Sequence, residues 1–261
     1  MNFNKSVKLL FLVSVLLLTF CSQNQDKAIV QIDQVNCNLS ASEWNFIKEI
    51  TKYEIEFYED IFSGSFPEIK MKIFGDTTSY RNFQKKISTS RSKNGFYSQS
   101  EKVIVINKND RYLKTVSHEI NHFILRSFIP VIPKWINEGL SEYFEYAILE
   151  NDLIKIKKQA KKETRLKEWI HETDKIDLED FLAWSNNKWR EVNSRPDFYS
   201  STLSWGIVYF FQNDDFRKNI LKELLRKIDQ GKDSNDIINE LYPGGMEQLK
   251  IDFFIFVDLN L

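Results

Sequence analysis

Cysteine and histidine are both scarce in this chain of 261 residues, which contains two cysteines and three histidines. The cysteines are Cys21 and Cys37. Because Cys21 lies at the end of a targeting segment, the body of the protein keeps one cysteine and has no internal disulfide framework, even in an oxidising compartment. Its stability must therefore come from packing, for which 21 Phe, 10 Tyr and 6 Trp provide large apolar surfaces.

The chain also lacks an excess of either charge. Its 36 basic and 37 acidic residues give a formal net charge of −1. Even the lysine-rich segment 155–169 contains acidic residues, which predicts a solvated helix face and not a phosphate-binding surface. We therefore expect no nucleic-acid partner.

The N-terminus carries a targeting segment. Lys5 and Lys8 precede the apolar run "LLFLVSVLLLTF", which is short for a membrane span but typical of a signal-peptide core. Cys21 follows directly, and the polar residues "SQNQDK" come next. This arrangement resembles a bacterial lipoprotein signal, in which the cysteine becomes the lipidated first residue of the mature protein.

These features predict a signal peptide of the lipoprotein type at residues 1–21, a tether at 22–39 and a folded domain at 40–261. The expected location is the bacterial cell envelope, with a lipid at Cys21 anchoring the protein to a membrane. Phe20 stands where lipoprotein signals usually have a small residue. Secretion without a lipid and an uncleaved anchor are therefore alternatives, and each of the three implies export.

The sequence patterns predict an α+β fold with a small mixed sheet. Apolar residues at helical spacing from Ser40 to Phe62 indicate a helix, with Ser40 or Ser42 as its cap. Alternation from Glu68 to Asp76 indicates a strand, followed by a short helix, and the β-branched run Val103 to Ile106 indicates another strand after a polar turn. From about residue 110 onward nearly every segment has a helical pattern.

The first helix of this second half carries the sequence "SHEINH". His118 and His122 are four residues apart, so both project from one face of a helix, while Glu119 lies about 100° round and flanks that face. This is the H-E-x-x-H arrangement of two zinc ligands and a general base. The alternative is an ordinary amphipathic helix whose apolar residues pack inward and whose histidines are merely partly exposed.

A second helix follows closely. Pro130 and Pro133 interrupt the chain, and an apolar stripe from Lys134 to Leu149 predicts a helix that packs against the first one. This packing would bring Glu138 to the two histidines as a third ligand and leave a fourth position for water. Glu142 would accept a hydrogen bond from the outer nitrogen of a ligating histidine. A solvated acidic face is the alternative for both glutamates.

The segment "HEINH" followed by "WINEGLSEYFE" resembles the gluzincin metallopeptidases, the clan of thermolysin and aminopeptidase N, and is most similar to the short bacterial peptidase-MA-like proteins. The resemblance extends from about residue 68 to 211, including a strand beside the cleft and a helical C-terminal part. It implies that His118, His122 and Glu138 bind zinc, that Glu119 is the base and that Glu142 is the partner of His118.

The family also uses a tyrosine or histidine that stabilises the transition state. Tyr199 is the candidate for that role here, against a role in packing or hydrogen bonding. Fifteen residues separate His122 from Glu138, fewer than in thermolysin or aminopeptidase N, so the connection must be compact. His171 lies on a charged segment without a partner motif and is expected at the surface.

The predicted activity is hydrolysis of peptide or protein substrates with one Zn²⁺ per chain and Glu119 as general base. The strand Val103 to Ile106, if it is a free edge, would hold an extended peptide through main-chain hydrogen bonds. Two alternatives remain: an envelope protein that binds zinc without catalysis, and a helical lipoprotein in which the motif is a coincidence.

Overall fold

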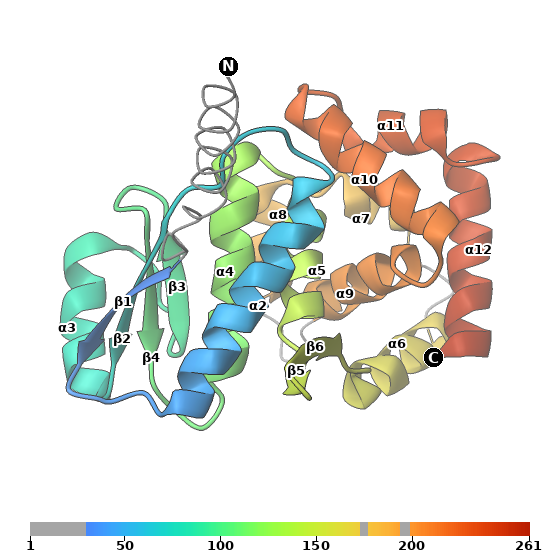
Figure 1. The fold of residues 1–261 in the computed structure, drawn as a ribbon. Helices are drawn as coiled ribbons and strands as arrows, with labels where there is room; N and C mark the ends of the chain where they lie inside the picture. Colours follow the sequence, from blue (N-terminus) through green and yellow to red (C-terminus); the bar gives the residue numbers. More distant parts are fainter. Residues whose placement is uncertain (1–29, 173–176, 194–198) are drawn as a thin grey trace, which may run out of the picture.

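The structure is a computed structural model that describes residues 30–172, 177–193 and 199–261. A small sheet forms one side of the molecule, and helices with one short hairpin form the rest (Figure 1), so the predicted α+β class is confirmed. The predicted signal peptide, including Cys21, lies outside the described residues. Within the described ranges, no helix is both long and apolar enough to cross a bilayer.

The front half contains the four-stranded sheet. Its elements are β1 (Val30–Val35), α2 (Ala41–Glu59), β2 (Ile69–Phe74), α3 (Thr77–Ile87), β3 (Gly95–Ser98) and β4 (Val103–Asn107). The strand order is β1-β2-β4-β3, in which β1, β2 and β4 are parallel and β3 is antiparallel to β4. The predicted strands and the helix that follows β2 are all present.

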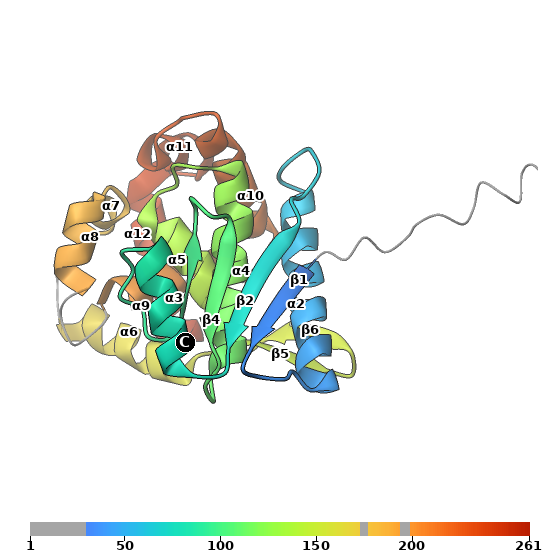
Figure 2. The same cartoon turned by 90° about the vertical axis from the view of Figure 1, so that its left-hand side faces the viewer.

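Helices cover both faces of this sheet. Helix α3 lies on one face, and α2 and α4 (Tyr112–Phe128) lie on the side of the other (Figures 1 and 2). The alternation along β2 explains this, because successive side chains of a strand point to opposite faces. Ile69, Met71 and Ile73 belong to the main core, while Phe74 packs against Tyr80 of α3.

Helix α2 begins at the residue that the sequence suggests. The Ser40 side chain accepts a hydrogen bond from the Glu43 backbone N–H, and the Glu43 carboxylate accepts one from the Ser40 backbone N–H. This reciprocal pair satisfies two backbone donors that the first turn of a helix leaves free. Of the two predicted caps, Ser40 is therefore the correct one.

The predicted tether at 22–39 is wrong for residues 30–35, because they form β1. Val30 pairs with Ile69 and Val35 with Phe74, so the whole strand lies parallel to β2. The sequence "VQIDQV" does alternate, but half of its residues are polar and mostly exposed. That pattern is close to the pattern of a solvated segment, and the strand forms because β2 offers a free edge for pairing.

The back half is mainly helical, as predicted. Its helices are α4, α5 (Lys134–Phe144), α6 (Ala160–Glu172), α7 (Leu178–Leu182), α8 (Asn186–Asn193), α9 (Tyr199–Phe211), α10 (Asp215–Asp229), α11 (Ser234–Leu241) and α12 (Gly245–Asn260). A hairpin of β5 (Ala147–Glu150) and β6 (Leu153–Ile156) interrupts them.

This hairpin corrects the predicted helix from Lys134 to Leu149, which ends at Phe144. Asn151 and Asp152 connect β5 to β6, with φ angles of 52° and 60°. Two consecutive residues with positive φ are typical of the tight turns that match the twist of a hairpin, and Asn and Asp tolerate this conformation. The turn residues therefore explain why the chain reverses where the apolar stripe appeared to continue.

Candidate metal centre

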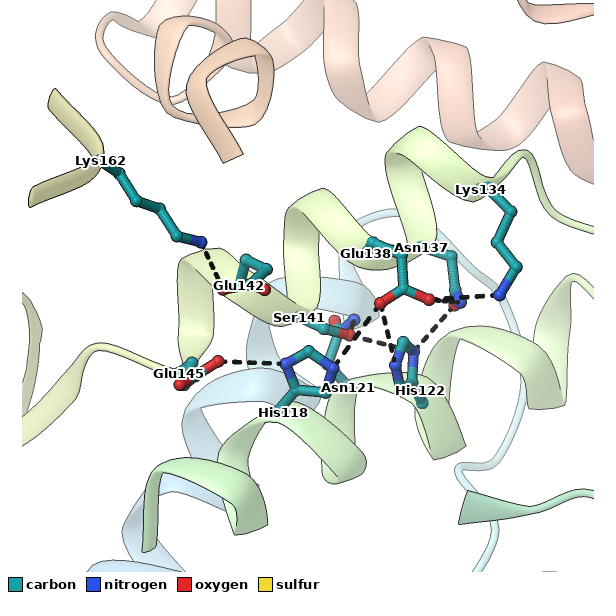
Figure 3. Close-up of polar contacts among 10 residues, drawn as sticks. All are labelled: His118, Asn121, His122, Lys134, Asn137, Glu138, Ser141, Glu142, Glu145 and Lys162. Atoms are coloured by element: carbon teal, nitrogen blue, oxygen red, sulfur yellow. Dashed lines mark hydrogen bonds and ion pairs between the residues drawn. The ribbon is translucent and has the colours of Figure 1, made fainter. Parts of the chain in front are cut away.

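The three predicted ligands converge from two neighbouring helices. His118 and His122 lie on α4, and their rings meet edge to face with centroids 4.7 Å apart. Glu138 lies on α5, and its Oε2 is 3.8 Å from Nε2 of His118 and 3.8 Å from Nε2 of His122 (Figure 3). One potential ligand atom from each residue lies within 4.8 Å of the other two. The prediction that these residues come together is confirmed.

Helix α5 holds Glu138 in place through its opposite face. Trp135, Ile136, Leu140 and Phe144 are buried in the main core. Gly139, which follows Glu138, lies against α9, where a Cβ atom would be 2.6 Å from the Ser204 carbonyl oxygen. Glycine is therefore the residue that allows the two helix backbones to approach this closely.

A chain of buried hydrogen bonds fixes the orientation of His122. Its Nδ1 is 3.1 Å from Oδ1 of Asn137 and 3.1 Å from Oγ of Ser141 (Figure 3). Asn121 donates to the Ser141 hydroxyl at 2.7 Å, and the Tyr58 hydroxyl donates to Asn121 at 2.6 Å. Because a carbonyl oxygen only accepts, Nδ1 of His122 carries the proton and Nε2 is left with a lone pair directed at Glu138.

His118 has an acidic partner, but it is Glu145 and not the predicted Glu142. Oε2 of Glu145 is 3.4 Å from Nδ1 of His118. Glu142 instead forms a close ion pair with Lys162 of α6 (Figure 3). The sequence points to Glu142 because it lies one turn beyond Glu138, whereas the lysine that holds it away comes from a helix that is distant in sequence.

Glu145 could have been noticed as an acid three residues after Glu142, at the end of the same helix. It remains close to its neighbour, because His118, Glu142 and Glu145 also form a group with ligand atoms within 4.8 Å of one another. Burial raises the pKa of Glu142, while the hydrogen bond with His118 lowers the pKa of Glu145 against the effect of its own burial. Of these two carboxyls, Glu145 therefore has the lower pKa.

The pKa values of the two histidines shift in opposite directions. Burial lowers the pKa of His118, but the hydrogen bond with Glu145 and the surrounding glutamates outweigh it and raise that pKa to about 10. Burial lowers the pKa of His122 to about 3, although Glu138 opposes this. Glu138 is buried, yet the histidines and Lys134 bring its pKa down to about 2. The cluster thus places one positive charge beside its carboxylates.

Glu119 lies beside the three convergent residues and does not join them. Its side chain is 7% exposed and belongs to neither of the two ligand groups found in the described residues. Burial raises its pKa to about 7, although the charge of His118 and a hydrogen bond from the Tyr97 backbone N–H counteract this. A carboxyl with such a pKa can take up and release a proton near neutral pH.

Strand β3 forms the edge of the sheet beside α4, which corrects the prediction for Val103 to Ile106. That run is β4, and it pairs with β2 on one side and with β3 on the other. The sequence patterns did not reveal that the short segment 95–98 forms a strand of its own. Gly95 packs directly on α4, because a Cβ atom at this position would be 2.7 Å from Cγ2 of Thr115.

The main-chain groups of β3 that do not pair with β4 can be assigned from the ladder, and one of them, the Gly95 N–H, donates to the Ser92 hydroxyl at 3.3 Å. The Asn107 N–H donates to the Asn94 carbonyl at 2.7 Å, so Asn94 and Asn107 are a hydrogen-bonded pair. Such pairs alternate along an antiparallel ladder. Phe96 is therefore hydrogen-bonded to β4, while Gly95 and Tyr97 direct their N–H and C=O groups away from the sheet.

Two further predictions concern the remaining candidates. Helix α9 begins at Tyr199, but the side chain of this residue lies outside the described part of the structure, so its role stays a prediction. His171 is exposed and its Nε2 is 3.0 Å from Oδ1 of Asp258. The expected surface position of His171 is confirmed.

The chain is similar to a known protein family over part of its length. A family model described as "Protein of unknown function (DUF1570)" matches residues 112–232. The match begins at the first residue of α4 and continues beyond α10, so it includes both histidines and all the glutamates of the cluster. No curated protein matches the chain.

Proposed function

We propose that this protein is a zinc-dependent hydrolase of peptide bonds, similar in its site to the gluzincin metallopeptidases. The observation that carries the proposal is the convergence of His118, His122 and Glu138 from two packed helices, with Glu119 beside them. Two histidines and one glutamate, with a fourth position open, are the ligand set of catalytic zinc sites in peptidases.

The donor set fits a zinc ion. A tetrahedral ion with ligands at about 2.0–2.2 Å separates its ligand atoms by roughly 3.3–3.6 Å, and both histidine nitrogens lie 3.8 Å from the Glu138 oxygen. Lys134 contacts the other oxygen of Glu138 at 3.2 Å, which leaves Oε2 for the metal. His118 would give up the proton that it carries on Nε2 when zinc binds, so both rings would keep Nδ1 protonated and present Nε2 to the metal.

The protein residues would divide the work of hydrolysis between them. Bound zinc would polarise the scissile carbonyl and lower the pKa of the attacking water. Glu119 takes the proton from that water and delivers it to the leaving amine, as its pKa of about 7 permits. Glu145, Asn137 and Ser141 keep the two imidazole rings in the orientation that presents Nε2.

The position of β3 favours a peptide as the substrate. Its outward C=O groups at Gly95 and Tyr97 offer main-chain hydrogen bonds to an extended chain, whereas the Gly95 N–H donates to the Ser92 hydroxyl and the Tyr97 N–H to Glu119. Tyr97 is also the residue whose N–H contacts Glu119, so a peptide on this strand would pass the general base. A small ester would use none of these groups.

The test is to measure zinc content and peptide hydrolysis on matched variants. We expect one zinc per chain in the parent protein, and Glu119→Gln should retain it while losing about 100-fold or more in hydrolysis. Glu138→Ala should bind zinc weakly and lose activity as a consequence. His171→Gln is the control, because this exposed histidine lies outside the cluster.

The outcomes separate the alternatives. Full hydrolysis by Glu119→Gln would refute the mechanism. A protein that binds zinc but cleaves no peptide would have a binding role, and a chain that cannot be loaded with zinc would make the motif a coincidence. Equal zinc affinity of Glu138→Ala and the parent would show that the third ligand is a different residue.

A further inference from the structure

Arg126 lies on the same stripe of α4 as the two histidines. It follows His122 by four residues, as His122 follows His118, so the three side chains share one helix face. Arg126 is half-buried, and it makes no hydrogen bond or ion pair with any residue in the described ranges. An arginine at the end of a helix can stabilise the helix dipole alone. That role does not require the side chain to line a groove.

Arg126 lines an open groove of about 790 Å³ at the C-terminal ends of β3 and α4. Tyr97 and Phe123 form the end of the groove nearest to Glu119, and their rings are 5.3 Å apart. Burial raises the pKa of Glu119 and of Tyr97, and the positive charge of Arg126 opposes this rise at both residues, so it acts across this space.

The other charges of the groove cancel. Glu68 and Glu101 oppose Lys70 and Lys102, and all four side chains are exposed to solvent. Arg126 is the half-buried charge among the side chains that line the groove. A guanidinium in such a place is suited to bind a carboxylate through two parallel hydrogen bonds.

The direction of β3 indicates which part of a substrate peptide would carry the carboxylate that Arg126 binds. Gly95 lies over Thr115 and Tyr97 over Phe123, so β3 and α4 run in the same direction and the groove lies at their C-terminal ends. A peptide that adds to β3 in the antiparallel sense, which is the slightly more stable pairing, enters with its N-terminal part at the groove. The carboxylates of that part are the side chains of Asp and Glu.

We infer that Arg126 is a specificity-determining residue that binds an acidic side chain on the N-terminal side of the scissile bond. The inference rests on the proposed peptidase function, because it names the substrate class of the same site. Its chemistry is a charge-assisted hydrogen bond, which contributes roughly 10- to 100-fold in affinity when it is shielded from water.

The first test uses peptide pairs that differ by Glu or Gln at each position around one cleavage site. The parent should cleave the Glu peptide about 10- to 100-fold faster, as kcat/KM, when Glu lies N-terminal to the bond. The Glu-to-Gln ratio should fall to near unity in Arg126→Gln and be partly retained in Arg126→Lys, which keeps the charge without the fork. Lys86→Gln is the matched control, because Lys86 is also in the last turn of a helix but lies outside the groove.

An unchanged ratio in Arg126→Gln would overturn the inference. So would a preference for peptides with a free C-terminus that amidation removes, since the carboxylate would then be terminal. The second test is binding of the same peptides to Glu119→Gln, with and without Arg126→Gln. If binding prefers Glu and depends on Arg126 but the parent hydrolyses no peptide, the peptidase proposal is refuted and this inference is not. Hydrolysis without that preference refutes this inference alone.

Discussion

Glu54 is an acidic residue in the interior of the described structure. It lies on α2 with no exposed surface, and neither of its carboxylate oxygens has a hydrogen-bond partner. Burial raises its pKa well above the ordinary value of 4.5, so the carboxyl is neutral in the folded protein at the pH where it is charged in the unfolded chain.

We expect Glu54→Gln to reduce the pH dependence of the free energy of unfolding. Because the folded pKa is raised, the stabilising effect of the proton is fully present below pH 4.5 and is lost as the pH rises. The loss is about 1.4 kcal/mol per pH unit while the folded carboxyl stays protonated.

Urea unfolding between about pH 5 and 7 measures this effect. The free energy of unfolding of Glu54→Gln, relative to that of the parent, should rise by that amount per pH unit. Glu56→Gln, on the exposed face of the same helix, should leave the pH dependence unchanged. Parallel curves for the parent and Glu54→Gln would contradict the expectation.

Single substitutions can test which glutamate is the partner of His118. Glu145→Ala should weaken zinc binding by roughly 10- to 100-fold, which is the usual effect of losing an outer partner of a metal ligand. Glu142→Ala should weaken it less, because Glu142 is paired with Lys162. Competition with a chelator of known affinity gives both values. A larger loss in Glu142→Ala would restore the assignment made from the sequence.

At the scale of elements, the contact between α5 and α9 positions the glutamate ligand. Gly139 lies at the closest approach of the two helices, and the atom that a Cβ would strike belongs to the backbone of α9. A backbone atom in a helix cannot move aside as a side chain can. Any residue larger than glycine must therefore displace α5 together with Glu138.

We expect Gly139→Ala to destabilise the protein by about 1–3 kcal/mol and to weaken zinc binding at the same time. Gly206→Ala, in α9, is the control, because its Cβ would meet the flexible end of the Leu166 side chain. Thermal unfolding and zinc titration of both variants give the comparison. If Gly139→Ala is destabilised but binds zinc as tightly as the parent, the contact between α5 and α9 does not control the geometry of the metal site.

Elements with strong local signals are predictable from this sequence. The cap at Ser40 and the alternation in β2 fix their own structures through nearby residues. Strands β1 and β3 have weak patterns and exist because neighbouring strands pair with them. The hairpin after α5 had a local signal in Asn151 and Asp152, but the apolar stripe ran through it and favoured a longer helix.

At the scale of the whole molecule, the site shows the same division. His118, Glu119 and His122 follow from helical spacing alone, and Glu138 follows from the packing of two adjacent helices. The exchange of Glu142 for Glu145 depends on Lys162, which only the tertiary fold brings near. Whether Arg126 has a partner depends on every residue that the fold brings near it. No sequence pattern could therefore predict that it makes no hydrogen bond or ion pair within the described residues.

The N-terminus yields a prediction for the protein in its cell. We propose that the mature chain begins at a lipidated Cys21 and partitions with membranes, because the apolar signal core ends at that residue. Mass spectrometry of the native N-terminus checks this, and Cys21→Ser should release the protein from the membrane fraction. An unmodified terminus at another residue would contradict the anchor without affecting the site.

Strand β1 limits the distance at which such an anchor would hold the folded domain from the membrane. Residues 22–29 alone separate Cys21 from Val30, the first residue of the sheet. Fully extended, a segment of this length spans about 30 Å, which is close to the thickness of the hydrocarbon core of a bilayer. A lipidated form would therefore reach only a thin layer above its membrane. Under the proposed function, a peptide would be hydrolysed only within that layer.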